Sequence, residues 1–138
     1  MSESAIHEAG HVVMAQMFGV QDIVVRRNAR RGNPGMEACL AGLDIPDLVC
    51  VLLAGVAAER IMAQETGRKL SPEHLRRAAR GDLAFLRWLG IRVLDLERAI
   101  RITEELLRER WQDVLRTALH IEQAWGKGED WREAPKEP

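Results

Sequence analysis

The sequence lacks the features of several protein classes. Its two cysteines, Cys39 and Cys50, fit neither a zinc knuckle nor a redox CxxC motif, and two cysteines do not make a disulfide scaffold. The strongest apolar run, from Leu48 to Ala58, covers eleven residues, whereas a helix needs about twenty to cross a bilayer. The N-terminus lacks the basic and apolar segments of a signal peptide. We therefore expect a cytoplasmic protein with reduced thiols and no membrane contact.

Net charge also excludes some partners. The chain has 20 basic and 21 acidic residues and a net charge of −1. So small a net charge gives no electrostatic argument for a nucleic-acid partner or an anionic membrane surface. The 138 residues are enough for one hydrophobic core but too few for two. We expect a single domain with no nucleic-acid partner.

Apolar periodicity predicts a mainly α fold with one short β element. Apolar residues recur at helical spacing in four segments that carry start or stop signals. The first segment is capped by Ser2 or Ser4 and runs to about Phe18; the others are 46–64, 71–89 with an interruption at Gly81, and 95–125. Residues 22–26 are the only convincing strand, and residues 27–42 are predicted to form an irregular loop. We assign 1–125 to the folded domain and 126–138 to a polar, flexible tail.

The segment from His7 to His11, which reads HEAGH, carries the clearest chemical signal. Histidines four positions apart lie on one face of a helix, so both imidazoles can point at one zinc ion. Glu8 lies beside that ion, where its carboxylate can take a proton from water and pass it to the leaving amine. Zinc would lower the pKa of the water to about 7 and polarise the scissile carbonyl. Gly10 is unfavourable inside a helix, and we expect that it lets another segment approach closely.

The residues alone leave two questions open. HExxH also occurs by chance, so His7 and His11 could be surface histidines on an amphipathic helix. A catalytic zinc site also needs a third protein ligand. The candidates for that ligand are Glu59, Glu65, His74 and Asp82. Glu59 is also suited to orient a ligand histidine through its free ring nitrogen, because it lies among small residues on a predicted buried helix.

Three segments resemble the FtsH-type zinc peptidases. Ser4 to Val13 is similar to their metal-binding helix, whose motif is HEAGH, and Leu53 to Arg60 resembles their GGRxAEE helix. Three positions depart from the second motif: Ala54, Val56 and Arg60. Arg80 to Leu83 resembles the segment that supplies the family's third zinc ligand. The interval of about seventy residues between the first and third segments is also that of the family.

This resemblance implies a compact zincin-like helical domain that binds Zn²⁺ through His7, His11 and Asp82, with Glu59 as the alternative ligand or the residue that orients a histidine. We expect Gly81 to break its helix so that Asp82 opens a new one. FtsH-type enzymes join this domain to membrane helices and an ATP-driven ring, but the chain has no GxxxxGK[ST] phosphate loop. The implied activity is a stand-alone, ATP-independent zinc endopeptidase acting on unfolded or extended polypeptide, as a homo-oligomer or with a delivery partner.

Zincin-like peptidases commonly hold an extended substrate against an edge strand by main-chain hydrogen bonds. Ile23, Val24 and Val25 are the only candidates for that edge. Two other functions fit the motif: a catalytically idle binding or regulatory module, and a repressor-cleaving protease of the ImmA/IrrE type. Glu8 argues against the idle module, which has no need of it. The HEAGH sequence and the position of Asp82 favour the FtsH type over the ImmA/IrrE type.

Overall fold

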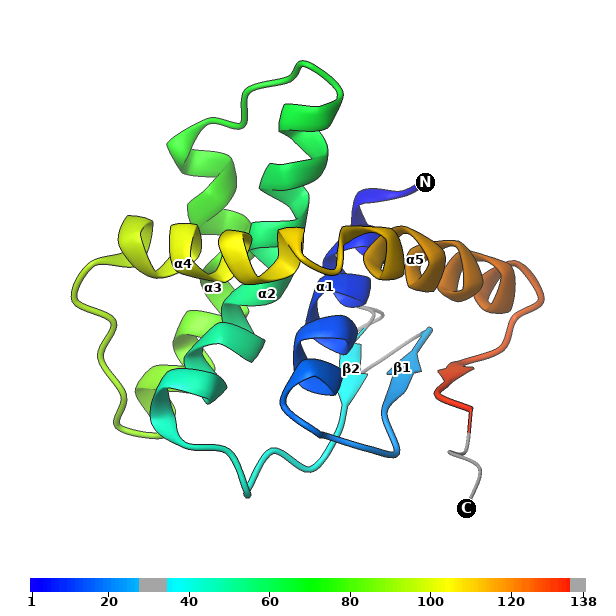
Figure 1. The fold of residues 1–138 in the computed structure, drawn as a ribbon, viewed down its shortest axis with the longest axis horizontal. Coiled ribbons are helices and arrows are strands. Elements are labelled where there is room, and N and C mark those ends of the chain that lie inside the picture. The colour runs from blue at the N-terminus through cyan, green and yellow to red at the C-terminus, as the bar shows by residue number, and fades with distance from the viewer. Residues whose placement is uncertain (28–34, 135–138) are drawn as a thin grey trace.

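Five helices and a small antiparallel sheet make up the part of the chain that the computed structural model describes, residues 1–27 and 35–134 (Figure 1). The helices are α1 (Glu3–Met17), α2 (Ile45–Glu65), α3 (Pro72–Trp88), α4 (Leu96–Arg108) and α5 (Trp111–Gly126). The strands are β1 (Val24–Arg26), β2 (Gly35–Glu37) and β3 (Trp131–Arg132). The fold is mainly α, as predicted. Residues 28–34 of the predicted loop and 135–138 of the predicted tail lie outside the described residues.

Capping side chains begin four of these helices. The Ser2 side chain accepts a hydrogen bond from the backbone N–H of Ala5 and so caps α1. Asp44, Ser71 and Asp95 cap α2, α3 and α4 by the same contact with the N–H three residues further on. Each contact satisfies a backbone donor that the start of a helix leaves without an intrahelical partner. The starts of these helices therefore follow from local sequence.

α1 and α2 lie side by side at the centre of the fold, because Gly10 allows their backbones to approach closely (Figure 1). A Cβ atom on Gly10 would lie 2.4 Å from the carbonyl oxygen of Ala54 and 2.7 Å from the Cβ of Ala58. The predicted close approach at Gly10 is confirmed. α4 packs on α2, α5 packs on α1, and α3 lies along the other side of α2. Among the largest fully buried side chains are Ile6, Met14, Leu53, Ile61, Leu86, Ile100, Leu107 and Ile121.

The sheet corrects the prediction that residues 22–26 are the only strand. β1 is the middle strand and pairs antiparallel with β2 on one side and β3 on the other. Ile23 and Val25 are buried, and the carbonyl of Ile23 accepts a hydrogen bond from the N–H of Glu133. Ile23, Val24 and Val25 therefore do not form an edge strand. The same pairing draws residues 131–133 into the domain, so the prediction of a flexible tail is wrong for them.

Two helix predictions are also corrected. α3 runs without interruption through Gly81 and Asp82, so Asp82 does not open a new helix. The predicted helix over 95–125 is two helices, with a break at Glu109 and Arg110 that lets α4 cover α2 while α5 covers α1. None of the described helices is long and apolar enough to cross a membrane. The apolar run from Leu48 to Ala58 lies in α2, and its second half is fully buried.

Candidate metal centre

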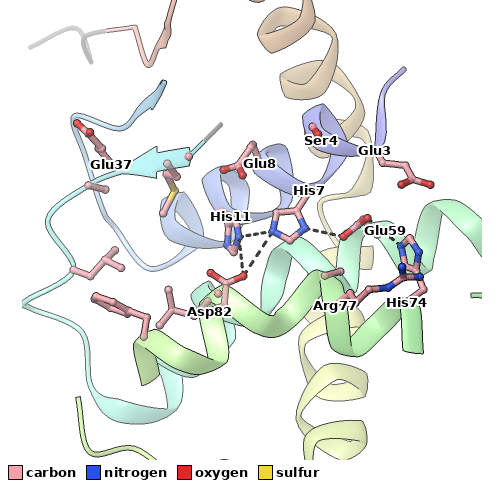
Figure 2. A pocket seen from close by; sticks show the side chains of 18 residues that line it. Glu3, Ser4, His7, Glu8, His11, Glu37, Glu59, His74, Arg77 and Asp82 are labelled. Atoms are coloured by element: carbon pink, nitrogen blue, oxygen red, sulfur yellow. Dashed lines mark hydrogen bonds and ion pairs between the residues drawn. The ribbon is translucent and has the colours of Figure 1, made fainter. Parts of the chain in front are cut away.

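The side chains of His7, His11 and Asp82 converge between α1 and α3 (Figure 2). The Nε2 atoms of the two histidines are 3.1 Å apart, and Asp82 Oδ2 lies 3.5 Å from Nε2 of His11 and 3.7 Å from Nε2 of His7. Ligands at the usual 2.0–2.1 Å from a tetrahedral zinc are separated from one another by about 3.4 Å. The three donor atoms therefore have the chemistry and the mutual spacing of a three-ligand zinc site.

Both histidines are held with Nε2 directed at this site. Nδ1 of His11 is 2.7 Å from the carbonyl oxygen of Val51, which can only accept a hydrogen bond, so Nδ1 carries the proton. Nδ1 of His7 is likewise 2.7 Å from Oε2 of Glu59. A proton on Nδ1 leaves the Nε2 lone pair available to a metal ion, and the acceptor fixes the orientation of the ring. The contact expected of Glu59 is thus present.

One stripe of α2 supports the two imidazoles. Val51, Gly55 and Glu59 are spaced four residues apart and so lie on the same face of the helix. A Cβ atom on Gly55 would lie 2.3 Å from Nε2 of His7 and 2.6 Å from Nε2 of His11. Only a residue without a side chain leaves space for the donor atoms to meet here. Gly55 therefore helps to shape the centre, although it offers no ligand atom.

Glu8 lies in the same cavity as the three donors. Its side chain is 7% exposed, and its Oε2 atom is buried with no hydrogen-bond partner among the described residues. A buried carboxylate oxygen without a partner carries a free-energy cost unless water or a ligand satisfies it. The carboxylate is thus placed to hold a water molecule beside the histidines. The role of Glu8 as a general base stays a prediction.

Charge in the centre favours a bound cation. Burial lowers the pKa of His7, but hydrogen bonds to Asp82 and Glu59 outweigh burial and raise the pKa to about 10. Burial also lowers the pKa of His11, but the charge of Asp82 outweighs burial and raises the pKa above its ordinary value. Burial acts to raise the pKa of Asp82, yet the two imidazoles hold it well below its usual range. The carboxylates thus make the centre strongly attractive to positive charge.

The other predicted candidates for a third ligand lie further out. His74 is half-buried, and its Nε2 atom is 3.4 Å from Oε1 of Glu59, so it contacts the residue that orients His7. Glu3, Glu59 and His74 form a second group of possible donors, but Glu59 is already engaged with His7. Glu65 is exposed and pairs with Arg108. Asp82 alone among the four candidates lies within 4 Å of both histidine Nε2 atoms in the described part of the chain.

The cavity around the centre has a volume of about 1050 Å³ and extends along β2. Gly35, Met36 and Glu37, which form this strand, line it. Figure 2 shows Glu37 on one side of the histidines and the polar groups of Glu59, His74 and Arg77 on the other. Apolar side chains also line the cavity, among them Met36, Ala38, Leu40, Leu52 and Phe85. The cavity is thus an open cleft with both polar and apolar walls.

Sequence reasoning did not identify Val51, Gly55 or β2 as parts of this site. The spacing of Val51, Gly55 and Glu59 was a usable signal, because residues four apart share a helix face. Val51 acts through its backbone carbonyl, which no side-chain pattern reveals. No protein-family model matches the chain, and a search of curated proteins found no significant match.

Proposed function

We propose that this chain is a zinc-dependent endopeptidase that cuts unfolded or extended polypeptide without ATP. One observation carries the proposal: two Nε2 atoms and the Asp82 carboxylate converge in a cavity that also contains a buried oxygen of Glu8 with no hydrogen-bond partner among the described residues. His7, His11 and Asp82 would hold the ion, and Glu59 and the Val51 carbonyl would orient the histidines. The resemblance to FtsH-type peptidases supports the same activity.

Glu8 is the proton carrier in this mechanism. Its carboxylate accepts a proton from a water molecule as the water oxygen attacks the scissile carbonyl carbon. It then donates that proton to the amide nitrogen, so that the C–N bond breaks and a carboxylate and an amine leave. Zinc, when bound, supplies Lewis-acid polarisation of the carbonyl and a lower water pKa, about 7. Burial of Glu8 keeps its carboxylate beside the reacting groups instead of in solvent.

β2 is the strand that can align a substrate. It is one of the two outer strands of the described sheet, and unlike β3 it lines the cleft beside the metal centre. An extended peptide could add to this strand through main-chain hydrogen bonds. The open cleft and the strand together favour unfolded chains and exposed loops as substrates, and a homo-oligomer or a delivery partner could present them. Cys39 and Cys50 are free thiols, and we propose the cytoplasm as the place of action.

Zinc stoichiometry tests the metal centre directly. Purified protein is reconstituted with zinc, desalted and analysed for metal, with wild type beside Asp82→Ala, Glu8→Gln and Asp113→Ala. We expect one zinc per chain in the wild type and clear weakening in Asp82→Ala, because two protein ligands remain. Asp113 lies on α5 outside the metal centre, its side chain is 40% exposed, and its replacement controls for the loss of an aspartate.

Peptide cleavage by the same proteins tests the chemistry. Glu8→Gln should keep its zinc and lose at least about a hundredfold in cleavage rate, the usual contribution of a positioned general base. A wild-type protein that binds zinc but cleaves no member of a broad peptide library would favour the idle binding module. A wild type that binds no zinc would overturn the peptidase proposal altogether.

A further inference from the structure

A second cavity lies on another face of α3, away from the metal centre. Its volume is about 520 Å³, within the size range of ligand-binding cavities. Four arginines surround it: Arg76, Arg80, Arg87 and Arg92. Arg76, Arg80, Leu83 and Arg87 recur at a spacing of four, three and four residues, so they form one stripe along α3. We call this cavity the arginine groove.

The charge around the groove is segregated from the rest of the chain. Residues 68–92 contain seven basic and two acidic residues, a local net charge of +5 in a chain whose net charge is −1. All four groove arginines are exposed. Among the described residues, none of the four has an ion-pair partner, whereas Arg26 and Arg60 are each paired with two carboxylates. Like charges four apart on a helix also repel each other, so the groove is arranged to receive negative charge.

The floor of the groove is apolar. Leu86 is buried there, and Leu83, Ile91 and Val93 are half-buried around it. No aromatic side chain lines the groove, so it lacks the stacking platforms on which single-stranded nucleic acids bind. The apolar residues that line the groove are buried or half-buried, whereas insertion into a lipid bilayer requires apolar side chains that project outward. A ligand that combines carboxylates with aliphatic side chains would match both the arginines around the groove and its apolar floor.

We propose that the arginine groove binds an acidic, aliphatic-containing peptide segment of another protein. Carboxylates of the segment pair with Arg76, Arg80, Arg87 and Arg92, and an aliphatic side chain packs on Leu83 and Ile91. Guanidinium groups suit this role because each can hold a carboxylate by two parallel hydrogen bonds. The site is distinct from the metal centre, and binding to it does not depend on the proposed peptidase activity.

α3 connects the two sites. Asp82, Ala78 and Phe85 on one face of the helix line the cleft of the metal centre, while Arg80 and Leu83 on the next face line the groove. A protein anchored in the groove by an acidic segment would therefore have its neighbouring residues close to the cleft. The groove would recruit a substrate or a delivery protein by its charge. This recruitment would raise the local concentration of substrate polypeptide at the cleft.

Fluorescence anisotropy of a labelled peptide tests this assignment. The probe is a fluorescein-labelled decapeptide of alternating glutamate and leucine, titrated with Glu8→Gln protein so that cleavage is suppressed. Arg76→Glu combined with Arg80→Glu should weaken binding by about tenfold or more, because attraction becomes repulsion. The matched control is Arg98→Glu with Arg101→Glu, which changes the same charge at exposed positions on α4. Circular dichroism checks that all the variants are folded.

Saturable binding that is lost in the groove variant and kept in the α4 variant supports the proposal. Absence of binding, or equal weakening in both variants, would overturn it. A decapeptide with serine in place of leucine should bind more weakly, and equal binding would contradict the role of the apolar floor. Tighter binding of a single-stranded DNA oligonucleotide, or of phosphatidylserine vesicles, would replace the peptide by another class of partner. Loss of zinc in Asp82→Ala should leave peptide binding unchanged, so failure at one site is distinguishable from failure at the other.

Discussion

Gly55 of α2 lies against the imidazole of His7, and a Cβ atom at position 55 would be 2.3 Å from Nε2 of that ring. The clashing atom, Nε2 of His7, lies at the far end of a side chain that can rotate, so the Gly55→Ala variant should still fold. Rotation would, however, carry Nε2 away from Asp82. We expect zinc affinity to fall by at least about tenfold, the lower end of the effect of disturbing groups around a metal site.

Competition with a chelator measures this affinity, and thermal unfolding of the metal-free protein checks the fold. Gly42→Ala is the control, because nothing lies within 4 Å of a Cβ at that position. Wild-type zinc affinity in Gly55→Ala would contradict the placement of both imidazoles against α2.

Gly10→Ala should lower stability through the packing of α1 against α2, and it is therefore measured on the metal-free protein. Its Cβ would meet the backbone carbonyl of Ala54 at 2.4 Å, and a helix backbone cannot rotate away as a side chain does. Separating α1 from α2 should cost about 2 kcal/mol or more, which exceeds the gain of up to about 1 kcal/mol from the better helix propensity of alanine. Urea unfolding of the metal-free protein measures the difference.

Gly81→Ala is the matched comparison for this experiment. Gly81 is also inside a helix, but nothing lies within 4 Å of a Cβ there. The substitution should therefore raise the free energy of unfolding, by up to about 1 kcal/mol. If Gly10→Ala raised the free energy of unfolding as Gly81→Ala is expected to do, the close contact between α1 and α2 would not be the reason for Gly10.

Local sequence was sufficient for the parts of the fold that local physics determines. The caps at Ser2, Ser71 and Asp95 each act within three residues, and the spacing of His7 and His11 follows from the helical repeat. The role of Gly10 was also predictable, because a glycine inside a helix is unfavourable unless close packing compensates. These features required no knowledge of the tertiary structure.

Tertiary packing decided the features that the sequence did not reveal. β2 contains only three residues, begins with Gly35 and depends on β1 for its hydrogen bonds. The break before α5 has no glycine or proline to mark it, since it arises from α4 and α5 covering different helices. α3 continues through Gly81 because the cost of one glycine, about 1 kcal/mol, is small beside the burial of Ala79 and Leu86. The choice of Asp82 likewise depended on how α3 packs.

Glu59 should tune zinc affinity without contributing a ligand atom. Its Oε2 accepts a hydrogen bond from Nδ1 of His7 at 2.7 Å, which fixes the ring and increases the basicity of Nε2. Glu59→Ala should weaken zinc binding by about 10- to 100-fold while the stoichiometry at saturation stays at one. Glu59→Gln keeps an acceptor oxygen and should lose less. If Glu59→Ala abolished zinc binding and Asp82→Ala did not, Glu59 would be the third ligand.

Arg60 should stabilise the fold at a distance from the metal centre. Its guanidinium donates to Glu104 at 2.6 Å and to Glu97 at 2.7 Å, which ties α2 to α4. Glu104 is only 7% exposed, so Arg60→Ala would leave a buried carboxylate without its cation and should cost about 3 kcal/mol. Glu97 is largely exposed, and Glu97→Ala should cost less than about 1 kcal/mol because solvent screens that pair.

Arg60→Met combined with Glu104→Leu separates the cost of the unpaired charge from the value of the pair. Replacing both partners by apolar side chains removes the buried charge, so the double variant should recover most of the stability that Arg60→Ala loses. Urea unfolding measures all the variants, and zinc content should stay at one per chain because the pair does not touch the metal centre. A double variant as unstable as Arg60→Ala would show that the ion pair itself, and not the isolated carboxylate of Glu104, determines how α4 packs on α2.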